Sequence, residues 1–192
     1  MCFIYNKQAK QSVQTHLQKE SNMLVTTLGY LVRDQKVLML HRVKKKNDIN
    51  HEKWIGIGGK LEDGETVLGC MQRECMEETG ILWQDPQLRG VITFNFREHE
   101  EDPVFSELMM LYSGGLFDET IHVECNEGDL VWLDWSTLPS LNLWKGDLIF
   151  LKLLKENHPL FCMELNYLGS ELTFATLNEK PLNLDDPSIY LS

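Results

Sequence analysis

A cluster of glutamates is the strongest chemical signal in the sequence. Glu74, Glu77 and Glu78 fall within a sector about 100° wide if the chain is helical, because each residue adds about 100° of rotation. Glu74 and Glu78, four positions apart, repel each other and destabilise a helix by roughly 0.2–0.5 kcal/mol. Local stability therefore does not explain the arrangement. A hard cation such as Mg²⁺ would explain it, because Mg²⁺ prefers carboxylate oxygens.

The residues around this cluster could complete a metal site. Gly58 and Gly59 let the backbone approach closely and could offer a carbonyl ligand, and Arg73 could hold a neighbouring carboxylate such as Glu65. Taken alone, the glutamates would fit better on a solvated acidic face with Arg73 as a surface residue. Their fixed spacing within one strand, loop and helix unit favours the metal site.

A helix over residues 66–79 is predicted to carry the glutamates. Thr66 is a suitable N-cap, and Gly80 is a suitable C-terminal stop. Upstream, residues 23–32 and 36–43 are rich in β-branched and aliphatic side chains and flank a short polar turn, which is typical of a β-hairpin.

Further strands and a second helix are predicted along the rest of the chain. A polar, cationic loop precedes a short strand at 54–57, and the remaining elements are strands at 88–96, 105–112 and 130–133, a helix at 147–157 and a hairpin at 161–177. We expect an α/β (α+β) fold in which a mixed β-sheet is sandwiched between helices. The expected division is a polar extension at 1–20, one domain at 21–178 and a tail at 179–192.

Composition narrows the function classes. The chain has 192 residues, of which 43% are hydrophobic and 24% are charged, and it has no apolar run of the roughly 20 residues that span a bilayer. Because the first twenty residues also lack the pattern of a signal peptide, we expect a cytoplasmic protein without a membrane role. A net charge of −11 disfavours nucleic acid as a partner, since such binding depends on Lys and Arg. The oligomeric state stays open.

The cysteines give no sign of a disulfide framework or a zinc site. They are five in number and show no C-x-x-C spacing, so we expect free, mostly buried thiols: Cys2, Cys70, Cys75, Cys125 and Cys162.

Residues 59–81, GKLEDGETVLGCMQRECMEETGI, resemble the Nudix box, Gly-x5-Glu-x7-Arg-Glu-U-x-Glu-Glu-x-Gly-U, in which U is a bulky apolar residue. Every charged and glycine position is filled, and Cys75 at the first U position is the one departure. The filled positions are Gly59, Glu65, Arg73, Glu74, Glu77, Glu78 and Gly80.

The resemblance implies a metal-dependent hydrolase that splits a diphosphate bond in a nucleotide. It implies that Glu74 and Glu78 bind Mg²⁺ or Mn²⁺, that Glu77 is a further ligand or an acid/base group, and that a backbone carbonyl near Gly59 assists. A nucleoside triphosphate would give a monophosphate and pyrophosphate. Glu127, which precedes a predicted strand as in MutT-like members, is the candidate general base. It could equally be a solvated loop acid.

Lysines could offset the negative charge of the chain near the substrate phosphates. Lys60 directly follows the paired glycines, and Lys44 begins the cationic loop, which also contains Lys45, Lys46 and Lys53. For the loop lysines a solvated loop is at least as good an interpretation.

The match outside the box is similar to 8-oxo-dGTP diphosphatases of the MutX type and, more distantly, to animal oxidised-purine triphosphatases. In the animal enzymes a Trp and two successive Asp residues read the base. Trp144 and Asp147 match this pattern, but Gly146 replaces the first Asp and Ile55 stands in place of an Asn. Trp144 could instead be a core residue and Asp147 a helix N-cap. The expected role is the sanitation of the nucleotide pool, a form of DNA repair.

Two alternatives stay open. The substrate could be another nucleoside-diphosphate-linked compound, such as ADP-ribose or a dinucleoside polyphosphate. The domain could also be a non-catalytic module that senses a nucleotide, although such modules often lose the glutamates that this chain keeps.

Overall fold

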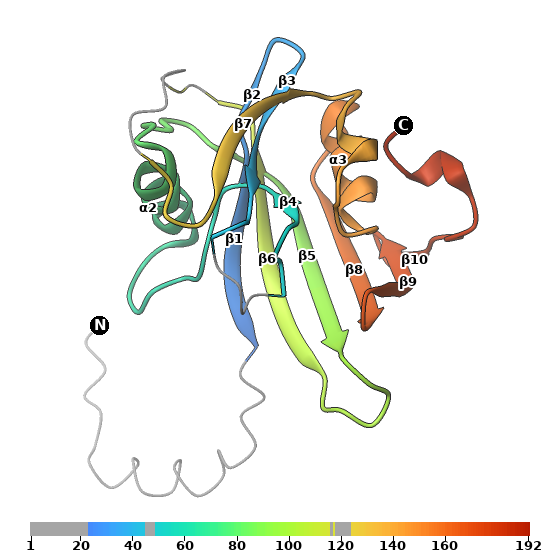
Figure 1. Cartoon of the computed structure of the whole chain (residues 1–192). Coiled ribbons are helices and arrows are strands. Elements are labelled where there is room, and N and C mark those ends of the chain that lie inside the picture. The colour runs from blue at the N-terminus through green and yellow to red at the C-terminus, as the bar shows by residue number, and fades with distance from the viewer. Residues whose placement is uncertain (1–22, 45–48, 116, 118–123) are drawn as a thin grey trace, which may run out of the picture.

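The structure, a computed structural model, describes residues 23–44, 49–115, 117 and 124–192. The expected N-terminal extension at 1–20, together with Cys2, Lys45 and Lys46, lies outside these ranges. Within them the strands form two sheets (Figure 1). The larger, mixed sheet has the order β1-β6-β5-β8-β9-β10, from β1 (Leu24–Tyr30), β6 (Phe105–Ser113), β5 (Gln87–Arg97), β8 (Phe161–Leu168), β9 (Glu171–Leu177) and β10 (Lys180–Pro181). The smaller sheet contains β2 (Val32–Arg33), β3 (Lys36–His41), β4 (Trp54–Ile55) and β7 (Asp129–Asp134), with β3 between β7 and the other two.

The first predicted hairpin is only partly present. β2 and β3 pair in antiparallel fashion, but β1 pairs in parallel with β6 in the other sheet. Tyr30 is the last residue of β1 to pair with β6, and after Leu31 the chain enters the smaller sheet at Val32. A single apolar run in the sequence therefore spans two sheets. Proximity along the chain favoured the hairpin, whereas the long-range β1–β6 pairing leaves no local signal.

The predicted glutamate-bearing helix is confirmed as α2 (Val67–Thr79). The Thr66 hydroxyl accepts a hydrogen bond from the Gly69 N–H at 3.0 Å and caps the first turn. Gly80 ends the helix in the left-handed conformation, with φ of 71°, and its N–H donates to the carbonyl of Met76. Both ends of the helix are thus set by the residues that the sequence indicated.

The remaining predictions agree with the structure to within a few residues. β5, β6 and β7 each begin or end one residue beyond the predicted bounds, and β8 and β9 form the predicted hairpin. The short strand predicted at 54–57 is β4 followed by an isolated bridge between Ile57 and Gly29. The second helix, α3 (Asp147–Lys155), ends two residues earlier than predicted.

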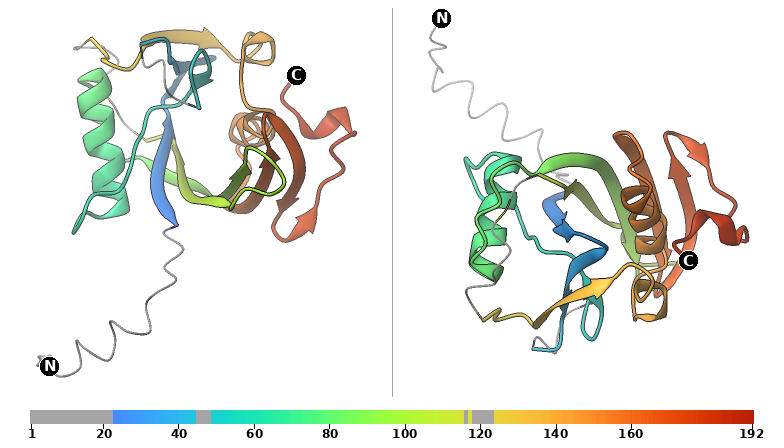
Figure 2. Two further views of the ribbon diagram at one scale, coloured as in Figure 1. Left: turned by 60° about the horizontal axis from the view of Figure 1, so that its bottom comes forward. Right: turned by 90° about the horizontal axis from the view of Figure 1, so that it is seen from above.

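The two helices lie at opposite ends of the space between the sheets (Figure 2). One apolar cluster surrounds α3 and includes Tyr30, Phe150 and Phe161, all nearly or fully buried. The other surrounds α2 and includes Met71 and Trp83. The helices therefore pack between the two sheets at either end, which leaves the strands between the helices to line a cavity.

The segment at 179–192 packs on the fold. β10 extends the larger sheet, the N–H of Leu191 donates to the carbonyl of Leu148 at 2.8 Å, and the Leu191 side chain is buried. Within the described ranges, no helix is long and apolar enough to cross a membrane. The cysteines described there are free thiols, of which Cys162 alone is exposed.

Candidate functional site

A cavity of about 1040 Å³ opens beside the N-terminal end of β1 and reaches α3. Its volume is at the upper end of the range for ligand pockets, roughly 300–1,000 Å³. Strands β1, β5, β6 and β8, the segment from Gly58 to Glu62, Glu74 of α2 and the start of α3 supply its walls. Among the described residues the polar lining side chains are Thr26, Thr27, Arg42, Asn50, Lys60, Glu62, Glu74, Glu107, Glu127 and Asp147.

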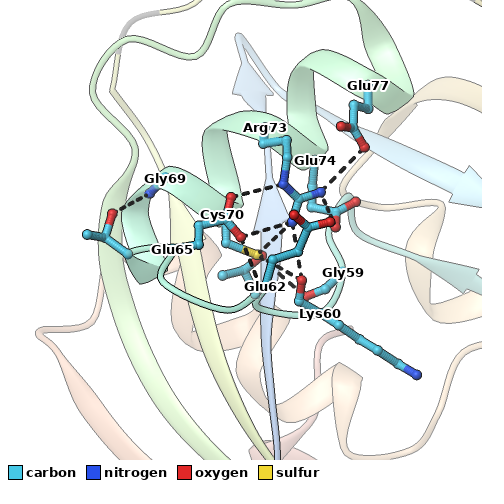
Figure 3. Close-up of polar contacts among 11 residues, drawn as sticks. Gly59, Lys60, Glu62, Glu65, Gly69, Cys70, Arg73, Glu74 and Glu77 are labelled. Carbon is cyan, nitrogen blue, oxygen red and sulfur yellow. Dashed lines mark hydrogen bonds and ion pairs between the residues drawn. The ribbon is translucent and has the colours of Figure 1, made fainter.

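Arg73 connects α2 to the loop that precedes it (Figure 3). Its guanidinium donates to both oxygens of Glu65, at 2.9 and 3.0 Å, and to Oε1 of Glu74 at 2.8 Å. A fourth bond reaches the Lys60 carbonyl at 3.2 Å. These bonds lower the pKa of Glu65, and they fix the loop against the helix with the bidentate geometry that only arginine offers. The predicted pairing of Arg73 with Glu65 is present.

Glu74 packs directly against Gly59. A Cβ at position 59 would lie 2.2 Å from Oε1 of Glu74, so any side chain there would displace the Glu74 carboxylate. The Gly59 carbonyl accepts a hydrogen bond from the Thr27 N–H at 2.9 Å, which pins this segment to β1. The first glycine of the motif therefore serves close approach of a carboxylate to the backbone, as the sequence suggested.

Glu78 is the most buried of the three clustered glutamates, with 7% of its surface exposed. Its carboxylate accepts a hydrogen bond from the Gly58 N–H at 3.1 Å. Burial raises the pKa of Glu78 to about 8, and the negative charges of Glu127 and Glu74 add to the shift. Burial also raises the pKa of Glu74, despite its bond to Arg73. These carboxyls are held close together in conditions that penalise their charge.

Glu127 is distant from these glutamates in the sequence but lies close enough to act on Glu78 in the structure. It lines the cavity beside Glu74 and forms a short ion pair with Arg42. Arg42, at the end of β3, was missed by the sequence analysis, which assigned the cations of this region to the lysines that follow. β3 is buried on both faces, so its pattern gives no local signal for the direction of position 42, and Glu127 is 85 positions away.

Glu77 is the most exposed of the three clustered glutamates. Its side chain is 61% exposed, and its nearest partner is Arg73 at 3.4 Å. Within the described ranges, no group of three or more His, Cys, Asp or Glu side chains is arranged to hold a metal ion, and Glu74 and Glu127 are paired with Arg73 and Arg42. The carboxylate donors of Glu74, Glu78 and Glu127 are of the type that a hard divalent cation prefers. A cation there would favour the charged form of Glu78, whose pKa is raised by burial and by the charges of Glu127 and Glu74.

The lysines separate into different roles. Lys60 lines the cavity, and its side chain extends away from the Arg73 contacts. Lys44 does not line the cavity, because its ammonium group donates to the Cys125 carbonyl at 2.7 Å. Lys53 lies over the ring of Trp144, 4.3 Å from the ring centroid. Lys44, expected to contact the substrate, therefore lies outside the lining of the cavity, whereas Arg42 is part of it.

Trp144 and Asp147 form the other end of the cavity. Trp144 is 8% exposed and belongs to the apolar cluster around α3, yet it lines the cavity, and its indole N–H donates to Asn50 at 2.7 Å. Asp147 is not the N-cap of α3, a position occupied by Gly146, but the buried first residue of the helix. Burial raises the pKa of Asp147 to about 7, although the charge of Lys53 opposes the shift. Both side chains line the cavity.

A family model matches this arrangement over most of the chain. The NUDIX domain model aligns with residues 23–154, which contain the carboxylates, Arg73 and Trp144. The chain belongs to the Nudix family. The predicted resemblance and mixed fold are confirmed.

Similar proteins extend this result. A Bacillus subtilis protein described as an uncharacterized Nudix hydrolase is 34% identical over 69% of this chain and 76% of its own length. The mouse oxidized purine nucleoside triphosphate hydrolase is 29% identical over 71% of this chain and 81% of its own length. A crystal structure of the MutT protein from Bacillus halodurans has a TM-score of 0.71 at 24% identity, over 83% of this chain and all of that one. The chain is thus a member of the Nudix hydrolase family, a family of hydrolases that act on pyrophosphate bonds.

The Nudix fold also explains two departures from the resemblance. At Gly146, a Cβ would lie 2.7 Å from the Tyr167 hydroxyl, which accepts a hydrogen bond from the Gly146 N–H at 2.7 Å. Tyr167 therefore occupies the space that a carboxylate at 146 would need. Cys75, in place of a bulky residue, is fully buried beside Thr79, so the departure concerns packing. Ile55 lines the cavity and offers no polar group there.

Proposed function

We propose that this protein is a divalent-metal-dependent nucleoside triphosphate diphosphatase that acts on oxidised purine nucleotides, with 8-oxo-dGTP as the leading substrate. The observation that carries the proposal is one cavity that joins the carboxylates of Glu74 and Glu127, whose charges act on the buried Glu78, to the ring of Trp144 and the carboxyl of Asp147. A cavity with acids at one end and an aromatic ring at the other suits a nucleotide whose phosphates and base lie far apart.

The metal end would be formed by Glu74 and Glu78, with Glu77 and the backbone carbonyl of Gly59 as further candidates. Mg²⁺, or Mn²⁺, bound there would neutralise phosphate charge and act as a Lewis acid for displacement at phosphorus. Arg73 keeps Glu74 in place through their 2.8 Å bond, and it anchors the loop through Glu65. Lys60 and Arg42 line the same cavity and would bind the phosphates.

Glu127 would act as the general base. It stands in the cavity with Glu74, and its negative charge contributes to the raised pKa of Glu78, so the two carboxyls interact electrostatically. Its ion pair with Arg42 keeps the carboxylate oriented. A base of this kind would accept a proton from the attacking water while α2 holds the metal.

The base end favours a purine but offers few groups to read it. Trp144 presents a rigid aromatic surface fixed by Asn50 and Lys53. Asp147, with a pKa of about 7, can accept or donate a hydrogen bond near neutral pH. Gly146 and Ile55 add no further polar group. We therefore expect the selectivity for 8-oxo-dGTP over dGTP to rest on Asp147, at roughly 1–3 kcal/mol for a well-placed contact.

The decisive experiment compares kcat/KM for 8-oxo-dGTP and dGTP with purified protein and Mg²⁺. The proposal predicts a monophosphate and pyrophosphate as products and a clear preference for the oxidised nucleotide. A ratio near one would remove the sanitising role but leave the diphosphatase. Turnover of ADP-ribose or diadenosine polyphosphates in place of any triphosphate would favour the other substrate classes. No turnover of any of them, with Mg²⁺ or Mn²⁺, would favour a sensing module.

A further inference from the structure

One carboxylate interrupts the apolar floor of the cavity. Glu107 on β6 is in register with Leu24 on β1 and with Phe94 on β5, and Phe94 is in register with Leu165 on β8. All four side chains line the cavity. Three of the four are hydrocarbon side chains, so an apolar residue at position 107 would pack there without a cost in free energy. Burial of a carboxylate, by contrast, costs free energy unless the group is bonded. The position of Glu107 therefore points to a polar ligand group opposite it.

Glu107 is oriented but not saturated. The Thr26 hydroxyl, which is nearly buried, donates to Oε1 of Glu107 at 2.5 Å. Lys60 is bridged to Thr26 along the backbone, and its charge opposes the rise in the pKa of Glu107 that burial causes. No ion pair joins Lys60 to Glu107, and no second hydrogen bond reaches Glu107 from the part of the chain that the structure describes. The second oxygen of Glu107 can therefore accept a hydrogen bond from a ligand.

The place of Glu107 along the cavity indicates which ligand group that is. On one side, Lys60 directly follows Gly59, against which the Glu74 carboxylate packs at the phosphate end. On the other side, Phe94 contacts Trp144 edge to face, with 6.3 Å between the ring centroids. Glu107 lies between these ends. In a nucleotide the part between the phosphates and the base is the sugar.

We propose that Glu107, oriented by Thr26, binds a hydroxyl group of the nucleotide sugar and makes the sugar a determinant of specificity. Carboxylates accept hydrogen bonds from ribose hydroxyls in other nucleotide sites, and a charged acceptor makes such a bond stronger. The inference rests on the proposed function, because it assumes that a nucleoside triphosphate fills the cavity. It goes beyond that function by assigning a role to Glu107, between the phosphate end and the base end of the cavity.

The test is a comparison of kcat/KM for GTP, dGTP and 2′,3′-dideoxy-GTP in the wild-type protein and in Glu107→Met, which keeps the length of the side chain and removes its charge. The wild type should lose about 10-fold or more on removal of the hydroxyl that Glu107 binds. A loss between GTP and dGTP would assign the 2′-hydroxyl, and a loss between dGTP and the dideoxynucleotide the 3′-hydroxyl. In Glu107→Met the difference in kcat/KM between the same two nucleotides should shrink to within about twofold.

Two further variants control the experiment. Ser106→Ala changes the next residue of β6, whose hydroxyl bonds to Asn95 on the opposite face, and it should keep the wild-type ratios. Thr26→Val removes the orienting hydroxyl and should reduce the ratio partway. Thermal unfolding checks that each variant is folded.

The outcomes separate the two proposals. Wild-type protein that hydrolyses neither 8-oxo-dGTP nor any of the three nucleotides would overturn the proposed function and this inference with it. If it hydrolyses 8-oxo-dGTP alone, the 8-oxo forms of the three nucleotides take their place in the same comparison. Equal hydrolysis of all three, or a sugar dependence that survives in Glu107→Met, would overturn the inference alone. A variant that weakens all three substrates equally would mean that Glu107 acts only on Lys60, and would also overturn it.

Discussion

The Glu78 carboxylate accepts a hydrogen bond from the Gly58 N–H at 3.1 Å, so an acid on α2 is bonded to the backbone at the rim of the cavity. Through this bond and the bonds of Arg73, the helix and the glycine-containing loop hold each other in one arrangement. The position of the clustered carboxyls thus depends on local contacts on both sides of the loop.

Substitution of Glu78 with Gln should abolish most activity. The amide keeps the shape and can still accept from Gly58, but it cannot supply a charge to a divalent cation, so kcat/KM in Mg²⁺ should fall by about 100-fold or more. Steady-state kinetics would measure the loss. Glu156→Gln, at the C-terminal end of α3 in a pair with Lys152, is the matched acid-to-amide control and should retain wild-type rates. Undiminished turnover in Glu78→Gln would exclude Glu78 as a ligand.

Replacement of Arg73 with Lys should lower activity although the charge is kept. Lysine cannot bind both oxygens of Glu65 and reach Glu74 at once, so the loop and the helix should lose their fixed geometry. We expect kcat/KM to fall by about 10- to 100-fold, with the Mg²⁺ concentration at half-maximal rate raised. A magnesium titration of the initial rate checks both effects. An unchanged magnesium requirement would mean that Arg73 does not position the ligands.

Asp147 should make stability depend on pH. Burial raises its pKa to about 7 in the folded protein, against an ordinary value of 3.8, so the folded state holds the proton more tightly than the unfolded state. Its contribution to stability is therefore present below about pH 4 and is lost as the pH rises to about 7, by on the order of 4 kcal/mol at most. Asp147→Asn should remove this dependence. Urea unfolding of both proteins between pH 4 and 8 measures the difference, and parallel curves would contradict the prediction.

Gly146→Asp, which restores the residue of the animal enzymes, should destabilise this protein. The new Cβ would lie 2.7 Å from the Tyr167 hydroxyl and 2.8 Å from a Leu165 methyl group. Overpacking of this kind costs about 1–3 kcal/mol. Tyr167→Phe in the same chain should restore part of the loss by opening space, and a thermal denaturation double-mutant cycle would measure the coupling. Additive effects of the two changes would show that Tyr167 is not the obstacle.

The local part of the site was predictable from the sequence. The capped helix, the Arg73–Glu65 pair and the close approach of Gly59 to Glu74 all lie within one segment, where spacing determines which side chains meet. Glu127, singled out in the sequence because it precedes β7, lines the cavity, and its role as a general base stays a prediction.

The long-range part was not predictable. Arg42 and Glu107 reach the cavity through the pairing of strands distant in sequence, and no spacing along the chain indicates such partners. The direction of Lys44 depends on the Cys125 carbonyl, which the loop brings to it from 81 positions away. The exposure of Glu77 could not be separated from the burial of Glu78 by helical angle alone, because the width of the buried sector depends on the neighbouring strands.

The parallel pairing of β1 with β6 also bears on the order of folding. Thr26 and Glu107 meet across the cavity floor although they are 81 positions apart, whereas α2 and the β8–β9 hairpin are built from neighbouring residues. Such pairings form slowly, because a long loop must close, at a cost in entropy, before any contact stabilises it. The helix and the hairpin should therefore appear early in refolding and the floor late. Recovery of catalytic activity should then lag behind recovery of the helical signal.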